Sequence, residues 1–271
     1  MSTSKKLWVW GLILLLDLFL LSCKSSTPTG ETANSGASSP VSSSGNAAKS
    51  GCYNAYYPAS ATMKKTYKIS YGNGAASASN YSESYSNLTS DGFVQKLEFA
   101  PMEKTAKAGA ATGVTVEGGI KCKPDGLAIL EYGNLTAGQN LKYKYKTINT
   151  NGISFPNDSE WKVGKKWQMV YDVEGQMTEA PIEAMKMSPK GTITISCEIL
   201  GSESVTVATG TYDAFKVAMT YNSNLKLNMM GREMPMNMTF KSNTWFAKDI
   251  GMIKSSTDEF KAITELVALT K

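Results

Sequence analysis

The 271-residue sequence contains no histidine. Its absence excludes the usual general base near pH 7, Ser-His and Cys-His nucleophile pairs, and histidine-based zinc and copper sites. Catalysis would have to use carboxylates, Lys, Tyr or Ser. Two S-x-x-K matches, starting at Ser159 and Ser223, fall in predicted loop or strand, where the two side chains would not meet. We therefore expect no enzyme, no cofactor and no metal site.

Dense runs of basic residues are also lacking. Lys and Arg number 28 against 23 Asp and Glu, so the formal net charge is only +5. The densest basic sites are lysine pairs such as Lys64-Lys65, which are too sparse to indicate a nucleic-acid partner. Hydrophobic residues make up 42% of the chain, which is ample for a folded core and argues against disorder along the whole length.

The N-terminus has the features of a secretory signal. Two lysines precede an apolar run at 7–21 that is interrupted only by Asp17 and is too short for a comfortable membrane span. The tetrapeptide L-L-S-C at 20–23 resembles the bacterial lipobox. This resemblance implies that residues 1–22 are removed and that Cys23 becomes lipidated. An ordinary signal peptide with an incidental cysteine, or an uncleaved anchor, is the alternative.

A linker separates the predicted lipidation site from the folded part. Residues 24–50 are almost all small or polar and cannot form a core. Segment 23–50 is therefore expected to be a flexible tether of roughly 30 Å, and 51–271 the folded domain. Lys24 follows the cysteine where inner-membrane lipoproteins often carry Asp, which favours the outer membrane if the bacterium has two membranes. We expect a lipid-anchored protein of the cell envelope.

Apolar and polar residues alternate repeatedly through the folded part, with Gly, Asn, Asp and Pro between the alternating runs. This pattern is typical of antiparallel β-structure, and long helices have little support. The predicted strands are 63–71, 78–88, 93–99, 114–123, 127–132, 141–148, 166–173, 192–200, 205–207, 212–221, 225–229, 234–246 and 250–255. The tail 258–269 suits a short helix or, slightly better, a closing strand at 263–267.

The strand pattern recurs in two halves, about 55–135 and 155–270. Each half begins with an aromatic–Pro pair and later contains a glycine turn, although chance likeness among short β motifs is the alternative. We expect an all-β fold with a strongly curved sheet or open barrel, built from two tandem related halves with little helix. The turns at Gly210 and Gly251 are expected to need positive φ.

Three motifs in the second half indicate a family. They are W-K-V-G-K-K-W at 161–167, V-T-V-A-T-G-T-Y-D-A-F-K-V at 205–217 and W-F-A-K-D-I-G-M-I-K at 245–254. Together they resemble TapB-like bacterial envelope lipoproteins, a domain of unknown function, over roughly 155–266, with a weaker echo over 57–132. The resemblance implies a strongly bent antiparallel sheet similar to the half-barrels of periplasmic lipoprotein carriers, and it brings no catalytic residues. The chain departs from the pattern at Ala208-Thr209, where a Pro would precede the Gly-Thr turn.

With Cys23 lipidated, three cysteines remain for an oxidising compartment. Cys122 and Cys197 each lie within a predicted strand, and a bridge between them would staple the two halves together. A bridge between Cys52 and Cys122 inside the first half is the alternative. We predict the Cys122–Cys197 pair and leave the other open.

Methionine is abundant, at 14 residues, and is concentrated in one stretch. Over 225–240 apolar residues occupy every second position on both sides of a turn at Gly231, so a hairpin would place them on one face. Pro235 lacks an N–H donor and marks an edge strand. We call the following predicted ligand-contacting residues the methionine face: Met229, Met234, Met236, Met238 and Phe240.

The methionine face allows three interpretations. It is an ordinary inward face, a soft wall for an apolar or lipid-like ligand because unbranched Met repacks around varied shapes, or a thioether site for Cu(I). We predict a non-catalytic binding or carrier module for an apolar ligand, tethered to the membrane by its N-terminal lipid. The alternative is a structural or assembly protein whose sheet edge or methionine face meets an envelope protein.

Overall fold

The computed structural model describes residues 52–72, 79–100, 114–130, 136–137, 141–177, 188–229, 232–259 and 261–271. The predicted signal segment, Cys23 and the linker lie outside these residues. Nearly all regular structure in the described part is β-strand, and its one helix is the short 3-10 turn η2 (Asp158–Glu160). None of the helical residues described forms a segment long and apolar enough to cross a membrane.

The strands join into one sheet. They are β1 (Lys64–Tyr71), β2 (Ser79–Ser86), β3 (Gly92–Phe99), β4 (Val114–Lys123), β5 (Gly126–Ile129), β6 (Thr136–Ala137), β7 (Leu141–Gly152), β8 (Phe155–Pro156), β9 (Lys166–Met177), β10 (Ser188–Val207), β11 (Gly210–Met229), β12 (Arg232–Ala247), β13 (Gly251–Thr257) and β14 (Ala262–Thr270). Among the described residues their order is β3-β2-β1-β14-β13-β12-β11-β10-β9-β7-β6-β4-β5-β8, with a further pairing of β3 with β4. The pairings are antiparallel.

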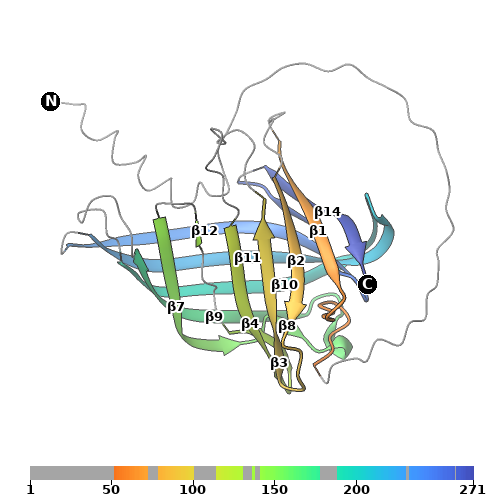
Figure 1. Cartoon of the computed structure of the whole chain (residues 1–271), viewed down its shortest axis with the longest axis horizontal. Coiled ribbons are helices and arrows are strands. Elements are labelled where there is room, and N and C mark those ends of the chain that lie inside the picture. The colour runs from red at the N-terminus through yellow and green to blue at the C-terminus, as the bar shows by residue number, and fades with distance from the viewer. Residues whose placement is uncertain are drawn as a thin grey trace, which may run out of the picture.

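The sheet curls strongly, as predicted. In Figure 1 the long strands β9 to β12 pass behind β1, β2, β4 and β7, which cross them steeply. Because β1 pairs with β14 and β3 with β4, the sheet wraps around an interior. Within the described residues, the two-residue strand β6 is the link between β4 and β7. The prediction of an all-β, open, curved sheet is confirmed, while the internal repeat stays a prediction.

Several strands differ in extent from the prediction. β10 and β11 each continue through a polar stretch, at 201–204 and 222–224, that the sequence pattern interpreted as a break. Polar residues fit a strand with one face exposed to solvent, so the ladder between β10 and β11 runs on, with one irregularity between Ile199 and Gly201. The tail forms β14, which confirms the closing strand.

An aromatic cluster fills much of the interior. Trp161 and Trp167 are buried in it and donate their indole N–H groups to the carbonyl oxygens of Pro156 and Ser154, at 3.2 and 2.9 Å. Buried indoles need such partners, so these tryptophans combine apolar packing with satisfied hydrogen bonds. Both tryptophans are therefore part of the core.

The segment Cys52–Met63, which we call the plug, precedes β1 and packs against this cluster. Tyr56 stacks on Trp161 with ring centroids 4.1 Å apart, and Tyr57 stacks on Phe155 at 4.2 Å. The plug is not a strand, so its hold on the interior comes from side chains and isolated hydrogen bonds rather than from a ladder.

A disulfide joins the start of the plug to β4. Cys52 is bonded to Cys122, with their Cα atoms 5.5 Å apart, and Cys197 is a free, buried thiol. The predicted Cys122–Cys197 pair is therefore wrong, and the alternative left open by the sequence is the one the structure contains. Cys197 lies on β10 opposite Trp167, inside the core, where burial raises the pKa of its thiol to about 12.

Candidate functional site

The predicted methionine hairpin is present. β11 and β12 pair with Leu227 opposite Met234, Leu225 opposite Met236, Ser223 opposite Met238 and Tyr221 opposite Phe240. Met229 is the last residue of β11 and lies opposite Arg232. The even-numbered residues from 234 to 240 are half-buried and the odd-numbered ones between them are exposed, so the expected alternation holds along β12.

From Met234 to Phe240 the methionine face is turned to the interior of the curled sheet, and the side chain of Met229 lies outside the described part. Leu225 and Leu227 on the same face are 4% and 2% exposed, and Met236 packs against the interior cluster that contains Met169. Tyr221 and Phe240 stack almost parallel, with centroids 4.4 Å apart. The face thus grades from buried leucines on β11 to half-buried methionines on β12.

One polar group interrupts this face. Ser223 lies between Tyr221 and Leu225 on the inner face, and its hydroxyl oxygen is buried with no hydrogen-bond partner in the described part of the chain. A buried hydroxyl without a partner costs free energy that a polar atom brought beside it would recover.

The outer margin of β12 is a partly protected sheet edge. β13 pairs with β12 only along Ser242–Ala247, so in the described structure the earlier part of β12 pairs with β11 alone. Pro235 has no N–H there. Six residues on, and therefore on the same side of the strand, the N–H of Lys241 donates to the carboxylate of Glu259 at 3.0 Å. Both features limit pairing with another strand.

The opposite, outer face of this hairpin is charged. A groove of about 450 Å³ crosses several strands there, lined by residues that include Lys190 and Lys226. Lys190 pairs with Glu174 at 2.5 Å and Lys226 with Glu233 at 3.3 Å. The hairpin therefore presents an apolar face to the interior and ion pairs to solvent.

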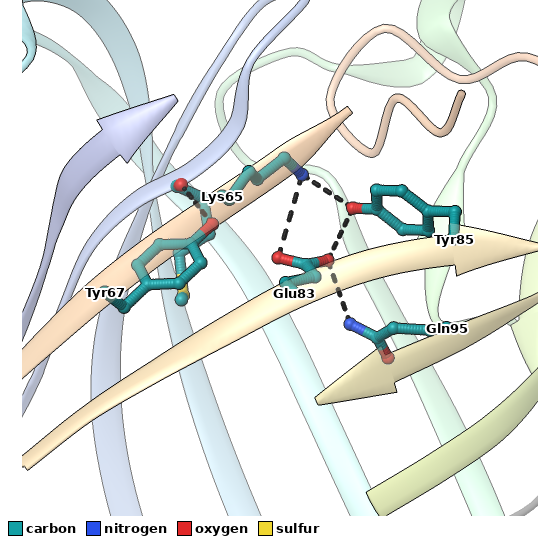
Figure 2. Close-up of polar contacts among 6 residues, drawn as sticks. Lys65, Tyr67, Glu83, Tyr85 and Gln95 are labelled. Atoms are coloured by element: carbon teal, nitrogen blue, oxygen red, sulfur yellow. Dashed lines mark hydrogen bonds and ion pairs between the residues drawn. The ribbon is translucent and has the colours of Figure 1, made fainter. Parts of the chain in front are cut away.

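A second group of residues, which the sequence analysis did not single out, forms a buried polar network (Figure 2). Lys65 of β1 donates to the hydroxyl of Tyr85 at 2.7 Å, and that hydroxyl donates to Glu83 at 2.5 Å. Gln95 of β3 donates its amide N–H to the same carboxylate oxygen at 2.9 Å. The Lys65 Nζ lies 3.7 Å from the other oxygen of Glu83.

The network lies deep in the protein. Lys65 is 1% exposed and Glu83 4%. Burial lowers the pKa of Lys65, and the nearby Glu83 carboxylate opposes that shift. The lysine also lies 5.1 Å from the ring centroid of Tyr85 and 5.8 Å from that of Tyr57 in the plug. This arrangement holds an ion pair away from water.

The described residues contain no group of three or more His, Cys, Asp or Glu side chains placed to hold a metal ion. Thioether binding of Cu(I) by the methionine face stays a hypothesis.

Residues 110–266 match the DUF3108-like family. The chain belongs to the DUF3108-like family. The match extends from before β4 into β14, so the DUF3108-like part includes the methionine hairpin and leaves the plug and β1 to β3 before its start. The narrower TapB-like assignment stays a prediction.

Two solved structures resemble this DUF3108-like protein. One is a protein with a YmcC-like fold, described as exported, from Bacteroides fragilis, with 10% identity, a TM-score of 0.44, and coverage of 80% of this chain and 100% of that one. The other is described as a lipoprotein from Parabacteroides distasonis, with 12% identity, a TM-score of 0.41, and coverage of 80% and 99%. Among curated proteins, no sequence matches the chain.

Proposed function

We propose that this DUF3108-like protein is a non-catalytic binding or carrier module for an apolar, lipid-like ligand in the bacterial cell envelope. Lipidation of Cys23 holds it to the membrane, at the outer membrane if the bacterium has two, and the linker lets the β domain stand away from the lipid surface. The ligand lies along the methionine face on the inner side of β12.

The observation that carries this proposal is the half-buried state of Met234, Met236 and Met238 on the inner face. A face serving only as core would be buried throughout, as Leu225 and Leu227 are. Methionine has three rotatable bonds and a polarizable sulfur, so a row of half-buried methionines adapts to a flexible acyl chain at little packing cost. The Ser223 hydroxyl on the same face, which has no hydrogen-bond partner among the described residues, offers a polar contact.

Photocrosslinking tests the proposal. The full-length protein is placed in lipid nanodiscs that contain a phospholipid with a photoreactive acyl chain, and crosslinked peptides are mapped by mass spectrometry. We expect crosslinks within the β12 peptide that spans the methionine face. Changing Met234, Met236 and Met238 together to Ser is expected to lower their yield at least about threefold, because the apolar surface is lost.

The matched control changes residues on the other face of the same strand. Asn237→Ser with Thr239→Ser alters two exposed positions and is expected to leave the crosslink yield unchanged. Equal yields from the inner-face and outer-face variants, or crosslinks confined to other strands, would refute binding at the methionine face.

An envelope protein partner is the second candidate, favoured by the one-sided pairing of β12 before Ser242. A protein added there as a strand would meet the gap left by Pro235 and the N–H already bound by Glu259. Such a partner would protect the β12 amides from hydrogen exchange, whereas an acyl ligand would act on the inner face without supplying backbone partners.

A further inference from the structure

We propose that the plug is a releasable cap on the interior of the β domain, and that the Cys52–Cys122 disulfide is the latch that keeps it closed. The proposal goes beyond the ligand role of the methionine face, because it concerns the opposite end of the chain and does not depend on that role.

The plug is attached at separate points. The backbone N–H of Ala55 donates to the Asp158 carboxylate at 2.8 Å, its carbonyl accepts from the N–H of Asp249 at 2.6 Å, and the Asn54 amide donates to the carbonyl of Pro156 at 2.8 Å. These contacts come from η2, β8 and the turn between β12 and β13. None belongs to a ladder, so the plug can detach while the sheet keeps its pairings.

The disulfide is placed at the end of the plug that would otherwise be free to move. The plug continues directly into β1 at its C-terminal end, so its N-terminal end is the one free to swing away. Cys52 lies at that end and is bonded to Cys122 of β4. With the bond intact, both ends of the plug are fixed to the sheet. With the bond broken, the plug is held at that end without a covalent link, by the isolated hydrogen bonds, the ring stacks and the burial of Tyr57 and Met63 in the core cluster.

Polar groups under and within the plug would regain contact with water if the plug were released. The Lys65 ammonium lies over the ring of Tyr57. A Cβ placed on Gly251 would lie 3.1 Å from that ammonium, 3.4 Å from the Pro58 ring and 3.6 Å from the Tyr56 carbonyl oxygen, so the plug and the lysine meet at this glycine. In a permanently closed core, well-packed apolar residues often stabilise a protein about as much as a buried ion pair such as Lys65 and Glu83 does. The Tyr57 hydroxyl is buried without a partner in the described residues. Release hydrates all of these groups, which gives a reason for their presence.

The chemical step is thiol–disulfide exchange with a dithiol reductant of the envelope. Its thiolate attacks the sulfur of Cys122, which is the less buried of the two cysteines, and Cys52 leaves and takes up a proton. The second thiol of the reductant then displaces Cys122 as a thiol. Two electrons and two protons pass to the protein, and the reductant becomes a disulfide.

Release would have two consequences. The aromatic cluster and the network around Lys65 would open to solvent at the end where the plug had packed. Residues 52–63 would also join the tether, because the linker precedes them, and would lengthen it by up to about 3.3–3.6 Å per residue. The latch therefore couples the redox state to how far the β domain reaches from the membrane.

Amine labelling tests the latch directly. The full-length protein in detergent is treated with an amine-reactive reagent before and after reduction by dithiothreitol, and modified lysines are quantified by mass spectrometry. Lys65 is the probe and Lys68, exposed on the same strand, is the internal control. We expect Lys65 labelling to rise at least about tenfold on reduction, through opening of the plug, and Lys68 labelling to stay constant.

Two variants and a second measurement complete the test. Cys52→Ser should label at Lys65 without reductant, whereas Cys197→Ser, which removes the free thiol, should behave as the wild type. Hydrogen exchange of reduced wild-type protein should lose protection in the plug and keep it in β10 and β11. Continued protection of Lys65 after complete reduction, or equal loss of protection across all strands, would overturn the proposal.

Discussion

Lys65 and Glu83 are two charged side chains in an interior that is mostly apolar and aromatic. Removing both charges from water is costly, and the cost is offset here by their mutual attraction and by hydrogen bonds from Tyr85 and Gln95. Because each charge is stabilised by the other, removing one of them should lower the free energy of unfolding far more than replacing both by apolar residues.

Lys65→Met is therefore expected to lower the free energy of unfolding by about 3–5 kcal/mol, since it leaves the Glu83 carboxylate buried without its cation. Combining it with Glu83→Leu should recover most of that loss. Urea denaturation of the single and double variants gives the coupling energy. Additive effects of the two substitutions would contradict a coupled buried pair.

The matched control is the ion pair between Lys254 and Glu265, 2.9 Å apart across β13 and β14 and partly open to solvent. Lys254→Met is expected to cost no more than about 1 kcal/mol, because water screens the pair.

The burial of Lys65 is encoded in the local sequence. Lys65 shares strand parity with Met63, Tyr67 and Ile69, so alternation alone places it on the inner face. The disulfide was not predictable in the same way. Strand assignments place Cys122 and Cys197 in regular elements, but pairing depends on where the plug folds, and that segment has no periodicity to reveal its position.

At the scale of elements, the turn between β12 and β13 joins two paired strands and also contacts the plug. Gly251 has φ of 89°, and a Cβ on it would lie 3.1 Å from the Lys65 Nζ and 3.4 Å from Pro58. The positive φ predicted from the sequence at Gly210 and Gly251 is confirmed. Gly251 is also constrained by its close approach to the plug, which leaves little room for a side chain. No local sequence pattern encodes this approach.

Gly251→Ala is expected to destabilise the domain by about 1–3 kcal/mol, because an L-residue is strained at this φ and the methyl group crowds Lys65. The change is measured by urea denaturation. Gly201→Ala is the control, since apart from its chain neighbours no atom of the described structure lies within 4 Å of its Cβ position, and it should shift stability by no more than about 0.5 kcal/mol. If Gly201→Ala lowered the stability as much as Gly251→Ala, the special role of the turn at Gly251 would be contradicted.

β12 carries a device against self-association. Pro235→Val restores a backbone N–H on the edge that β13 leaves uncovered and adds a β-branched side chain. We expect concentration-dependent association of this variant in analytical ultracentrifugation. Thr239→Val, on the same edge, changes the side chain without adding a donor and should stay as the wild type. Association of both variants alike would assign the effect to hydrophobicity instead.

The hairpin itself was well predicted, for a physical reason. Its alternation is strict and its turn is short, so register and facing follow from local sequence. The lengths of β10 and β11 were not, because their polar central residues look like loop residues until the exposed outer face of the sheet is known.

In the whole molecule, the first and last described strands along the chain lie side by side. β1 pairs with β14, and this junction encloses the interior that the plug and the network share. Composition and alternation predict a curved antiparallel sheet. They cannot predict which segment closes its end, because the plug is held by stacking and isolated hydrogen bonds to residues about 100 positions away, such as Pro156, separated by 102.

This enclosed interior should make the protein sensitive to alkali. Burial, followed by the charge of Glu83, raises the pKa values of Tyr57, Tyr67 and Tyr85 well above 10.0. Below about pH 10 folded and unfolded chains both keep these protons, so the contribution to stability is complete. Above it the unfolded chain loses protons that the folded chain retains, and the free energy of unfolding falls by about 1.4 kcal/mol per pH unit for each tyrosine.

Lys65 acts in the opposite sense. Its pKa is lowered from 10.5, so the unfolded chain holds a proton more tightly than the folded one, and stability gains from rising pH until about 10.5. Three tyrosines against one lysine leave a net loss above about pH 10. Urea denaturation across this range, with tyrosinate absorbance followed in parallel, checks the slope.

Tyr57→Phe removes a buried hydroxyl that has no partner in the described chain. It should therefore be neutral or stabilising at pH 7 and reduce the alkaline slope by up to one proton, whereas an unchanged slope would mean that this hydroxyl ionises as readily in the folded chain as in the unfolded one.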